Sequence, residues 1–225
     1  MQPIREQRDQ LELAGRLVDT ALLMPPGAHG AVALAHGRVN DLDHPSLEAA
    51  ARGAARAGWA ALRFNFPYRQ RGADQPDPFA VLVETHLAAA RWLRGRLPGP
   101  GRRLVMAGKS LGSRTALAAL EEVEATGVIL LGYPLHPARS RELRPGEPLR
   151  RLNLPLLAVQ GSRDPLARPE LLAPLLASLP GPVERLEVAG GNHSFEAPGG
   201  PARQQGVWRE IARRVEGFLK ALNGD

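Results

Sequence analysis

The sequence predicts one α/β domain over residues 1–225, with a mostly parallel central sheet and helices on both of its faces. Short apolar runs that are typical of buried strands alternate with helical segments about five times, which is the pattern of a parallel sheet. Of the 225 residues, 44% are hydrophobic and 23% are charged. This composition is enough for one buried core, and the chain is too short for two ordinary domains.

The first part of the chain contains two short apolar runs, Leu11–Leu13 and Leu17–Leu23, that predict a hairpin. The small apolar residues of Ala31–Ala35 predict a strand that is buried on both faces. The alanine-rich segment Pro45–Ala57 precedes a glycine and predicts a helix. Trp59–Phe64 then returns to a strand pattern, which completes one strand-helix-strand unit.

A loop rich in proline and glycine follows, after which we expect Asp77 to cap a helix. Pro78 would take the first helical position, where its missing N–H removes no helical hydrogen bond, and the helix is expected to end near Arg96. The next elements are predicted as a strand, a helix and a strand, at Arg103–Ala107, Leu111–Glu124 and Gly127–Leu131.

The stretch Gly132–Pro155 is expected to be mostly irregular and too short for a large helical cap domain. It is interrupted by prolines at Pro134, Pro137, Pro145, Pro148 and Pro155. The remaining elements are predicted as the strand Leu156–Gln160, the helix Pro169–Leu179 with a disturbance at Pro174, the strand Val183–Ala189 and the amphipathic helix Gln204–Leu222.

One pentapeptide between a predicted strand and a predicted helix has a pattern that is typical of a nucleophilic serine. Gly108-Lys109-Ser110-Leu111-Gly112 has the form G-x-S-x-G. A sharp turn at this point projects a serine hydroxyl above the sheet edge, and the flanking glycines are needed where strand and helix pack closely. The helix that begins there also directs its N–H groups at a reacting oxygen.

A serine becomes a strong nucleophile only when a base takes its proton and an acid orients that base. Asp164 follows one later predicted strand and His193 follows the next, so all three groups lie at the carboxyl edge of the sheet. Each alone has a structural explanation, as an ordinary turn, a helix cap or a loop histidine. Together, the order Ser110, Asp164, His193 is that of α/β-hydrolases and predicts a catalytic triad.

Acyl transfer also requires hydrogen-bond donors for the developing oxyanion. The backbone N–H of Leu111 is one candidate, and the N–H of Arg38, just after the strand Ala31–Ala35, is the second. His36 is expected to be structural, with its ring bonded to loop backbone.

Several blocks in one order extend the pattern over most of the chain. They are Leu34-Ala35-His36-Gly37, Asp43-His44-Pro45, Arg63-Phe64-Asn65-Phe66-Pro67-Tyr68, Gly108-Lys109-Ser110-Leu111-Gly112-Ser113-Arg114, Gly132-Tyr133-Pro134-Leu135-His136-Pro137, Gln160-Gly161-Ser162-Arg163-Asp164 and Gly191-Asn192-His193-Ser194-Phe195. The chain thereby resembles α/β-hydrolases of the dienelactone-hydrolase-like clan. Within this clan it resembles the small family that includes the testis-expressed protein 30 and the hydrolase-like part of a chromatin-complex subunit. The resemblance implies an α/β-hydrolase fold with Ser110, Asp164 and His193 as the triad.

The chain departs from this family pattern after His36-Gly37, where Arg38-Val39-Asn40 stands in place of small residues. The bulky residues stand where the second candidate oxyanion donor, the N–H of Arg38, is expected, and they reduce the space around it. Dienelactone hydrolases use a cysteine nucleophile, so Ser110 argues against that particular activity. Fold resemblance does not identify the substrate.

Four polar side chains follow strands at the reactive edge and are candidates for a substrate pocket: Asn65, Tyr68, Tyr133 and His136. For Asn65 and Tyr68, the alternative is a side chain that holds a long loop in place. For His136, which lies between Pro134 and Pro137, a role in loop structure is favoured.

These observations predict a serine hydrolase that cleaves a carboxylic ester or thioester through an acyl-enzyme intermediate. The expected partner is a small acyl substrate, and the reaction requires no metal or organic cofactor. A hydrolase-fold binding or scaffold module with little turnover is the alternative from a different class. A peptidase or an acyltransferase would use the same triad, and the oligomeric state is left open.

The composition argues against several other classes of protein. Lysine and arginine exceed aspartate and glutamate by 29 to 23, but the excess is dispersed and only 4% of residues are aromatic, so nucleic-acid binding is not expected. The absence of cysteine excludes disulfides and a cysteine nucleophile. The polar N-terminal residues and the lack of an apolar run of about 18 residues predict a cytoplasmic protein with no membrane partner.

Overall fold

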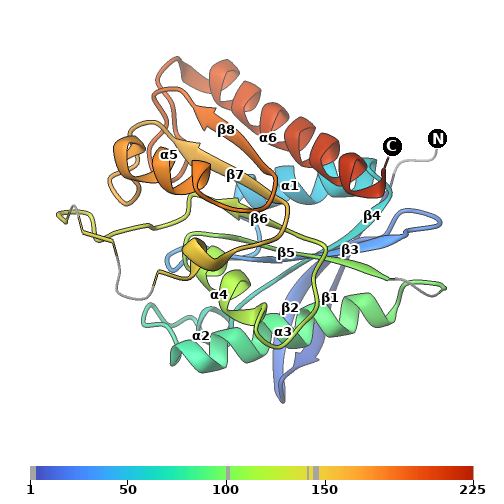
Figure 1. Ribbon diagram of the computed structural model, residues 1–225. Coiled ribbons are helices and arrows are strands. Elements are labelled where there is room, and N and C mark those ends of the chain that lie inside the picture. The colour runs from blue at the N-terminus through green and yellow to red at the C-terminus, as the bar shows by residue number, and fades with distance from the viewer. Residues whose placement is uncertain (1–3, 100–101, 141, 144–146, 225) are drawn as a thin grey trace.

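The computed structural model of the protein describes residues 4–99, 102–140, 142–143 and 147–224, which contain one central sheet (Figure 1). Its strands are β1 (Glu6–Leu13), β2 (Arg16–Leu23), β3 (Gly30–Ala35), β4 (Trp59–Phe64), β5 (Arg103–Lys109), β6 (Gly127–Leu131), β7 (Leu156–Gly161) and β8 (Val183–Val188). They pair in the order β1-β2-β4-β3-β5-β6-β7-β8. β1 and β2 form the predicted hairpin, β2 is antiparallel to β4, and all the other neighbours are parallel.

Helices cover both faces of the sheet, as predicted (Figure 1). They are α1 (Pro45–Arg56), α2 (Pro67–Gln70), α3 (Phe79–Gly95), α4 (Leu111–Ala119), the 3₁₀ turn η1 (Pro148–Arg151), α5 (Pro169–Ala177) and α6 (Gly200–Asn223). α1 and α6 pack together on one face, whereas α3, α4 and α5 lie on the other. In the part of the chain that the structure describes, no helix combines the length and the apolar character needed to cross a bilayer.

The central strand β5 shows why the strand sequences are apolar without alternation. Its residues Val105 and Ala107 belong to the apolar cluster beneath α1 and α6. Leu104 and Met106 belong to the cluster beneath α3 and α4. Because successive side chains point to opposite faces and both faces are covered, the middle of such a strand is apolar on both sides.

Several predicted boundaries are wrong by a few residues. β1 begins at Glu6, five residues before the predicted Leu11, and α5 ends at Ala177, two residues before the predicted Leu179. α3 is capped at Pro78 instead of Asp77, because the Asp77 carboxylate accepts a hydrogen bond of 2.7 Å from Arg71. β5 continues past Ala107 to Lys109, since glycine does not interrupt the backbone ladder with β6. α4 ends at Ala119, not Glu124, because the chain turns there to enter β6.

The last two helices also differ from the sequence prediction. α5 passes through Pro174 without a break. Pro174 is an exposed residue only five positions after the start of the helix at Pro169, so its missing N–H removes a hydrogen bond from the first turn alone. α6 begins at Gly200, four residues before the predicted Gln204.

The stretch between β6 and β7 is irregular, as predicted, and η1 is the one helical turn among its described residues. Residues 141 and 144–146, which include the predicted loop proline Pro145, lie outside the described residues. In the described part of the chain, no large cap domain lies over the carboxyl edge of the sheet.

Candidate active site

Ser110 lies in the sharp turn between β5 and α4. Its φ of 52° and ψ of −111° fall in a region that residues other than glycine seldom adopt. The turn is held by the Ser110 N–H, which donates to the Leu131 carbonyl at 3.0 Å, and by the Ser113 N–H, which donates to the Ser110 carbonyl at 3.0 Å. The strained backbone is therefore supported by hydrogen bonds on both sides.

The two glycines of the pentapeptide are required by close approach of backbone to backbone. A Cβ on Gly108 would lie 2.2 Å from the carbonyl carbon of Gly112. A Cβ on Gly112 would lie 2.1 Å from the carbonyl oxygen of Ala35 on the neighbouring strand β3. Neither position has space for a side chain, which is the packing reason for glycine on each side of Ser110.

The structure brings Ser110, His193 and Asp164 into one hydrogen-bonded chain. The His193 ring places Nε2 at 2.8 Å from Ser110 Oγ and Nδ1 at 2.7 Å from Asp164 Oδ2. The three residues follow β5, β8 and β7, so they meet at the carboxyl edge of the sheet. In this arrangement Nδ1–H donates to the carboxylate, and Nε2 is the atom that can accept the serine proton.

The carboxylate of Asp164 is fully buried and has several donors. Its Oδ1 accepts the Leu166 N–H at 2.8 Å, and its Oδ2 also accepts the side-chain amide of Gln160. A buried carboxylate is costly unless hydrogen bonds replace its lost water. These donors therefore stabilise a negative charge beside His193.

The loop that carries His193 has its own internal support. Asn192 Oδ1 accepts the N–H groups of Ser194 and Glu196 at 2.8 and 3.0 Å. Phe195 is buried and has a φ of 65°. The His193 side chain retains 24% exposure, so the imidazole can be reached from solvent.

The two backbone segments predicted to supply oxyanion donors both lie near Ser110. Leu111 is the first residue of α4, where N–H groups have no partner within the helix. The loop that contains Arg38 adjoins Ser110, because a Cβ on Gly37 would lie 3.3 Å from the Ser110 Cβ. The Tyr68 hydroxyl holds this loop by donating to the Arg38 carbonyl at 2.7 Å.

His36 helps to hold the same loop. Its Nε2 accepts the Phe66 N–H at 2.9 Å, and its Nδ1 lies 2.7 Å from the Gly37 carbonyl. Burial lowers the pKa of His36 to about 4, although the Gly37 carbonyl raises it in part. The ring is thus neutral at pH 7 and has the structural contacts expected for it.

The four side chains predicted to line a pocket are all buried, and each has a contact within the protein. Asn65 Oδ1 accepts the Leu42 N–H at 2.9 Å, and Tyr68 holds the loop of Arg38. The Tyr133 hydroxyl donates to Glu147. His136 Nε2 accepts the Arg168 N–H at 3.0 Å. These contacts hold loops together, and substrate contact by these residues stays a prediction.

Two residues at the site were not singled out from the sequence. Gln160 donates to Asp164, and the available signal was a polar residue at the end of an otherwise apolar strand. Lys109 is 1% exposed and donates to the His193 carbonyl at 2.8 Å. Its signal was its rarity, because Lys109 and Lys220 are the two lysines of the chain.

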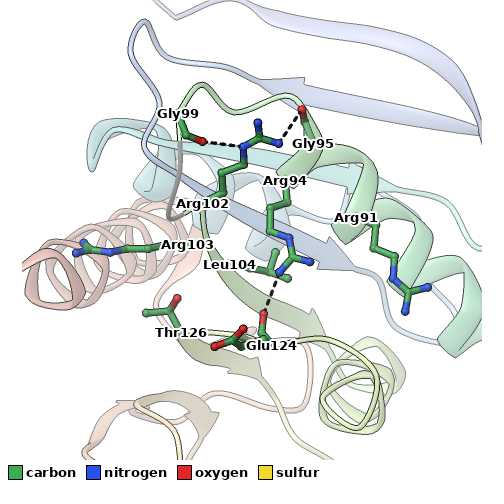
Figure 2. A pocket seen from close by; sticks show the side chains of 10 residues that line it. Arg91, Arg94, Gly95, Gly99, Arg102, Arg103, Leu104, Glu124 and Thr126 are labelled. Carbon is green, nitrogen blue, oxygen red and sulfur yellow. Dashed lines mark hydrogen bonds between the residues drawn. The ribbon is translucent and has the colours of Figure 1, made fainter.

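A hollow of about 730 Å³ lies at the opposite, amino-terminal edge of the sheet (Figure 2). Figure 2 shows that two of its arginines donate hydrogen bonds to the protein itself: Arg102 donates to the Gly95 and Gly99 carbonyls, and Arg94 donates to the Glu124 carbonyl. β5 separates this edge from Ser110 by about 20 Å, at about 3.3 Å per residue. The hollow is therefore distinct from the candidate active site.

Solved structures share this architecture. An α/β serine hydrolase homologue from Coxiella burnetii is 17% identical, with a TM-score of 0.73 over 95% of this chain and 99% of that one. XC6422 from Xanthomonas campestris, described as an α/β serine hydrolase without a lid, is 18% identical, with a TM-score of 0.73 over 97% and 95%. Dienelactone hydrolase from Anabaena variabilis is 20% identical, with a TM-score of 0.69 over 93% and 95%. At these identities the likeness shows the fold.

The sequence itself matches a family. The pattern of the alpha/beta hydrolase domain covers residues 28–220, which is most of the chain. The matched segment includes Ser110, Asp164 and His193, and the order and parallel pairing of β3 to β8 agree with the assignment. The chain therefore belongs to the alpha/beta hydrolase domain family.

Proposed function

We propose that this protein is a serine hydrolase that cleaves a carboxylic ester or thioester through an acyl-enzyme intermediate. The observation that carries the proposal is the continuous hydrogen-bonded chain from Ser110 Oγ through both ring nitrogens of His193 to Asp164. A serine at a strained turn, a base within hydrogen-bond reach and a buried acid are the three parts that nucleophilic catalysis by a hydroxyl requires.

In the first half-reaction, Ser110 Oγ attacks the acyl carbon while His193 Nε2 accepts the hydroxyl proton. The carbon–oxygen double bond becomes an oxyanion, which the N–H groups of Leu111 and Arg38 stabilise. His193 then donates its proton to the departing alcohol or thiol, and the acyl-enzyme remains. Asp164 holds the ring in the correct tautomer and stabilises the transient imidazolium.

In the second half-reaction, water gives a proton to His193 and attacks the acyl-enzyme. Collapse of the second oxyanion releases the carboxylic acid, and His193 returns the proton to Ser110. An amine or alcohol in place of water would give acyl transfer with the same three side chains. Product analysis with added alcohol or amine separates these outcomes.

The surroundings of Ser110 favour small or extended acyl substrates. The stretch between β6 and β7 is short and irregular in its described residues, so no large domain formed by them encloses the reactive edge. The similar Xanthomonas campestris protein is also described as lacking a lid. We further propose that the chain belongs to the narrower group that includes the testis-expressed protein 30, on the strength of its ordered sequence blocks.

The proposal is tested with a fluorophosphonate probe, which labels an activated serine. We expect the wild type to be labelled, Ser110→Ala to be unlabelled, and Ser178→Ala to be labelled like the wild type, because Ser178 is an exposed residue at the end of α5. Hydrolysis of p-nitrophenyl acetate and of an acetyl thioester should follow the same order. A folded wild type that is neither labelled nor active would favour the scaffold alternative.

A further inference from the structure

Lys109 is a buried cation that has no part in the proton transfers described above. It is the last residue of β5, it directly precedes Ser110, and it is 1% exposed. Burying an ammonium group is costly unless it is hydrogen-bonded or paired. The contacts of the Lys109 ammonium show which groups compensate for the cost of burying it beside Ser110.

Both of the contacts described for the Lys109 ammonium lead to the loop of His193. Nζ donates to the His193 carbonyl oxygen at 2.8 Å, and it lies 5.2 Å from the centroid of the Phe195 ring. The first is a charge-assisted hydrogen bond and the second is a cation–π contact, each strengthened by burial. The strand end that carries the nucleophile is thus connected to the loop that carries the base.

We propose that Lys109 is a positioning residue whose ammonium ties the His193 loop to β5 and thereby holds the imidazole between Ser110 and Asp164. The inference rests on the proposed serine hydrolase function and adds one more residue to it. The bonds of Asn192 shape the loop internally, whereas Lys109 connects the loop to the element that ends at Ser110. A displacement of about 1 Å at a catalytic group can lower the rate about a hundredfold.

The strength of the hydrogen bond from Lys109 to the His193 carbonyl depends on whether the lysine is protonated. Burial lowers its pKa to about 8, although Asp164 and Glu196 raise it in part. The ionisable groups around it are Asp164 after β7, His193 and Glu196 after β8, and His44 before α1. A neutral amine donates a weaker hydrogen bond than an ammonium, so we expect labelling by the probe to decline above about pH 8.

The test compares Lys109→Met, which removes the charge and keeps the length, with Lys220→Met as a matched control at an exposed lysine. The readout is the second-order rate constant of fluorophosphonate labelling as a function of pH. We expect Lys109→Met to react about ten- to a hundredfold more slowly and to lose the decline above about pH 8. Lys220→Met should follow the wild type, and the thermal midpoints show whether each variant is folded.

Because the chain has no cysteine, the ammonium can be restored chemically. Lys109→Cys, alkylated with 2-bromoethylamine in denaturant and refolded, carries a side chain of lysine length with sulfur in it. The sulfur lowers the pKa of the amine, so labelling should recover and its alkaline decline should move to lower pH. If Lys109→Met does not fold, this shift between the wild type and the alkylated protein decides the question.

The outcomes separate the two proposals. An unlabelled wild type overturns the serine hydrolase function. A labelled wild type with Lys109→Met of equal rate and equal pH profile overturns the positioning role alone. The positioning role is also overturned if the alkylated protein keeps the wild-type alkaline decline, or if Lys109→Met lowers only the thermal midpoint.

Discussion

Charged side chains are buried at the carboxyl edge of the sheet and largely exposed at its amino edge. At the carboxyl edge, Asp164 and Lys109 are buried, and their charged atoms meet other groups of the candidate site. At the amino edge, Arg91 and Arg102 are exposed, and Arg102 donates to the carbonyls of Gly95, the last residue of α3, and of Gly99 in the loop that follows (Figure 2). Arg103 extends toward α6 and donates to Asn223 at 2.6 Å.

The difference shows that a cluster of charged residues does not by itself indicate a reactive site. A guanidinium group that donates to the last carbonyl of a helix, as Arg102 does to Gly95, satisfies a group that lacks a helical partner. The other carbonyls that Arg94 and Arg102 bind belong to loops. At the carboxyl edge, the strained backbone of Ser110 lies beside buried ionisable side chains. This combination is expected of a catalytic centre.

The largest expected effect comes from Asp164→Asn at the carboxyl edge. An amide in place of the carboxylate favours the wrong tautomer of His193, so kcat should fall on the order of 10⁴-fold while the fold is retained. Hydrolysis of p-nitrophenyl acetate measures the loss. Arg94→Gln at the amino edge is the control, and its kcat should match the wild type; a similar loss in both variants would contradict the contrast between the edges.

Two glycines offer a matched pair for stability. Gly112→Ala places a Cβ against the Ala35 carbonyl, and we expect the free energy of unfolding to fall by about 1–3 kcal/mol or more, as for other overpacked positions. Gly95→Ala at the end of α3 meets open space and should raise it by about 0.5–1 kcal/mol through helix propensity. Urea unfolding of both variants measures the difference, and equal midpoints would refute the packing argument.

Acid should weaken the protein through its buried histidines. Burial lowers the pKa values of His36 and His86 from 6.5 to about 4, so between these pH values the unfolded chain binds protons that the folded protein does not. The free energy of unfolding therefore decreases as the pH falls from about 6.5 to about 4. Urea midpoints across this range should show a smaller slope for His86→Gln, and an unchanged slope would remove His86 from the explanation.

The smallest expected effect lies at the amino edge. Arg102→Gln removes exposed hydrogen bonds to the carbonyls of Gly95 and Gly99, and the free energy of unfolding should change by about 0.5 kcal/mol or less. Labelling of Ser110 by the probe should be unchanged. A loss of labelling would show that the amino edge is coupled to the reactive edge.

Much of the fold is predictable from local pattern. The apolar run Ala31–Ala35 and the helix Pro45–Ala57 lie within one residue of β3 and α1, because periodicity and glycine or proline boundaries act locally. The start of α3 differs from the prediction because the Asp77 carboxylate pairs with Arg71, a contact that depends on how the loop folds back. The end of α4 differs because the entry into β6 decides where the helix stops.

For the candidate site, the sequence likewise indicates the residues, whereas the tertiary structure sets their geometry. The pentapeptide identifies Ser110, and their order after later strands identifies Asp164 and His193. Their atoms lie 2.7 to 2.8 Å apart, a geometry that residues 83 positions apart reach only through tertiary structure. For Tyr68 and His136 the sequence points to a role in loop structure as one interpretation, but it does not show which backbone groups they bind, because their partners come from other segments.

The sequence alone was sufficient for the alternation of strands and helices, the glycines that the turn at Ser110 requires, and the identity of the groups available for acyl transfer. Tertiary structure decided that Gln160 contacts Asp164, that Lys109 contacts the loop of His193, and that Arg94 and Arg102 at the amino edge bind carbonyls. The physical reason is range: backbone preference and hydrophobic period act over a few residues. Burial, hydrogen-bond partners and pKa values depend on neighbours that only the packed sheet brings together.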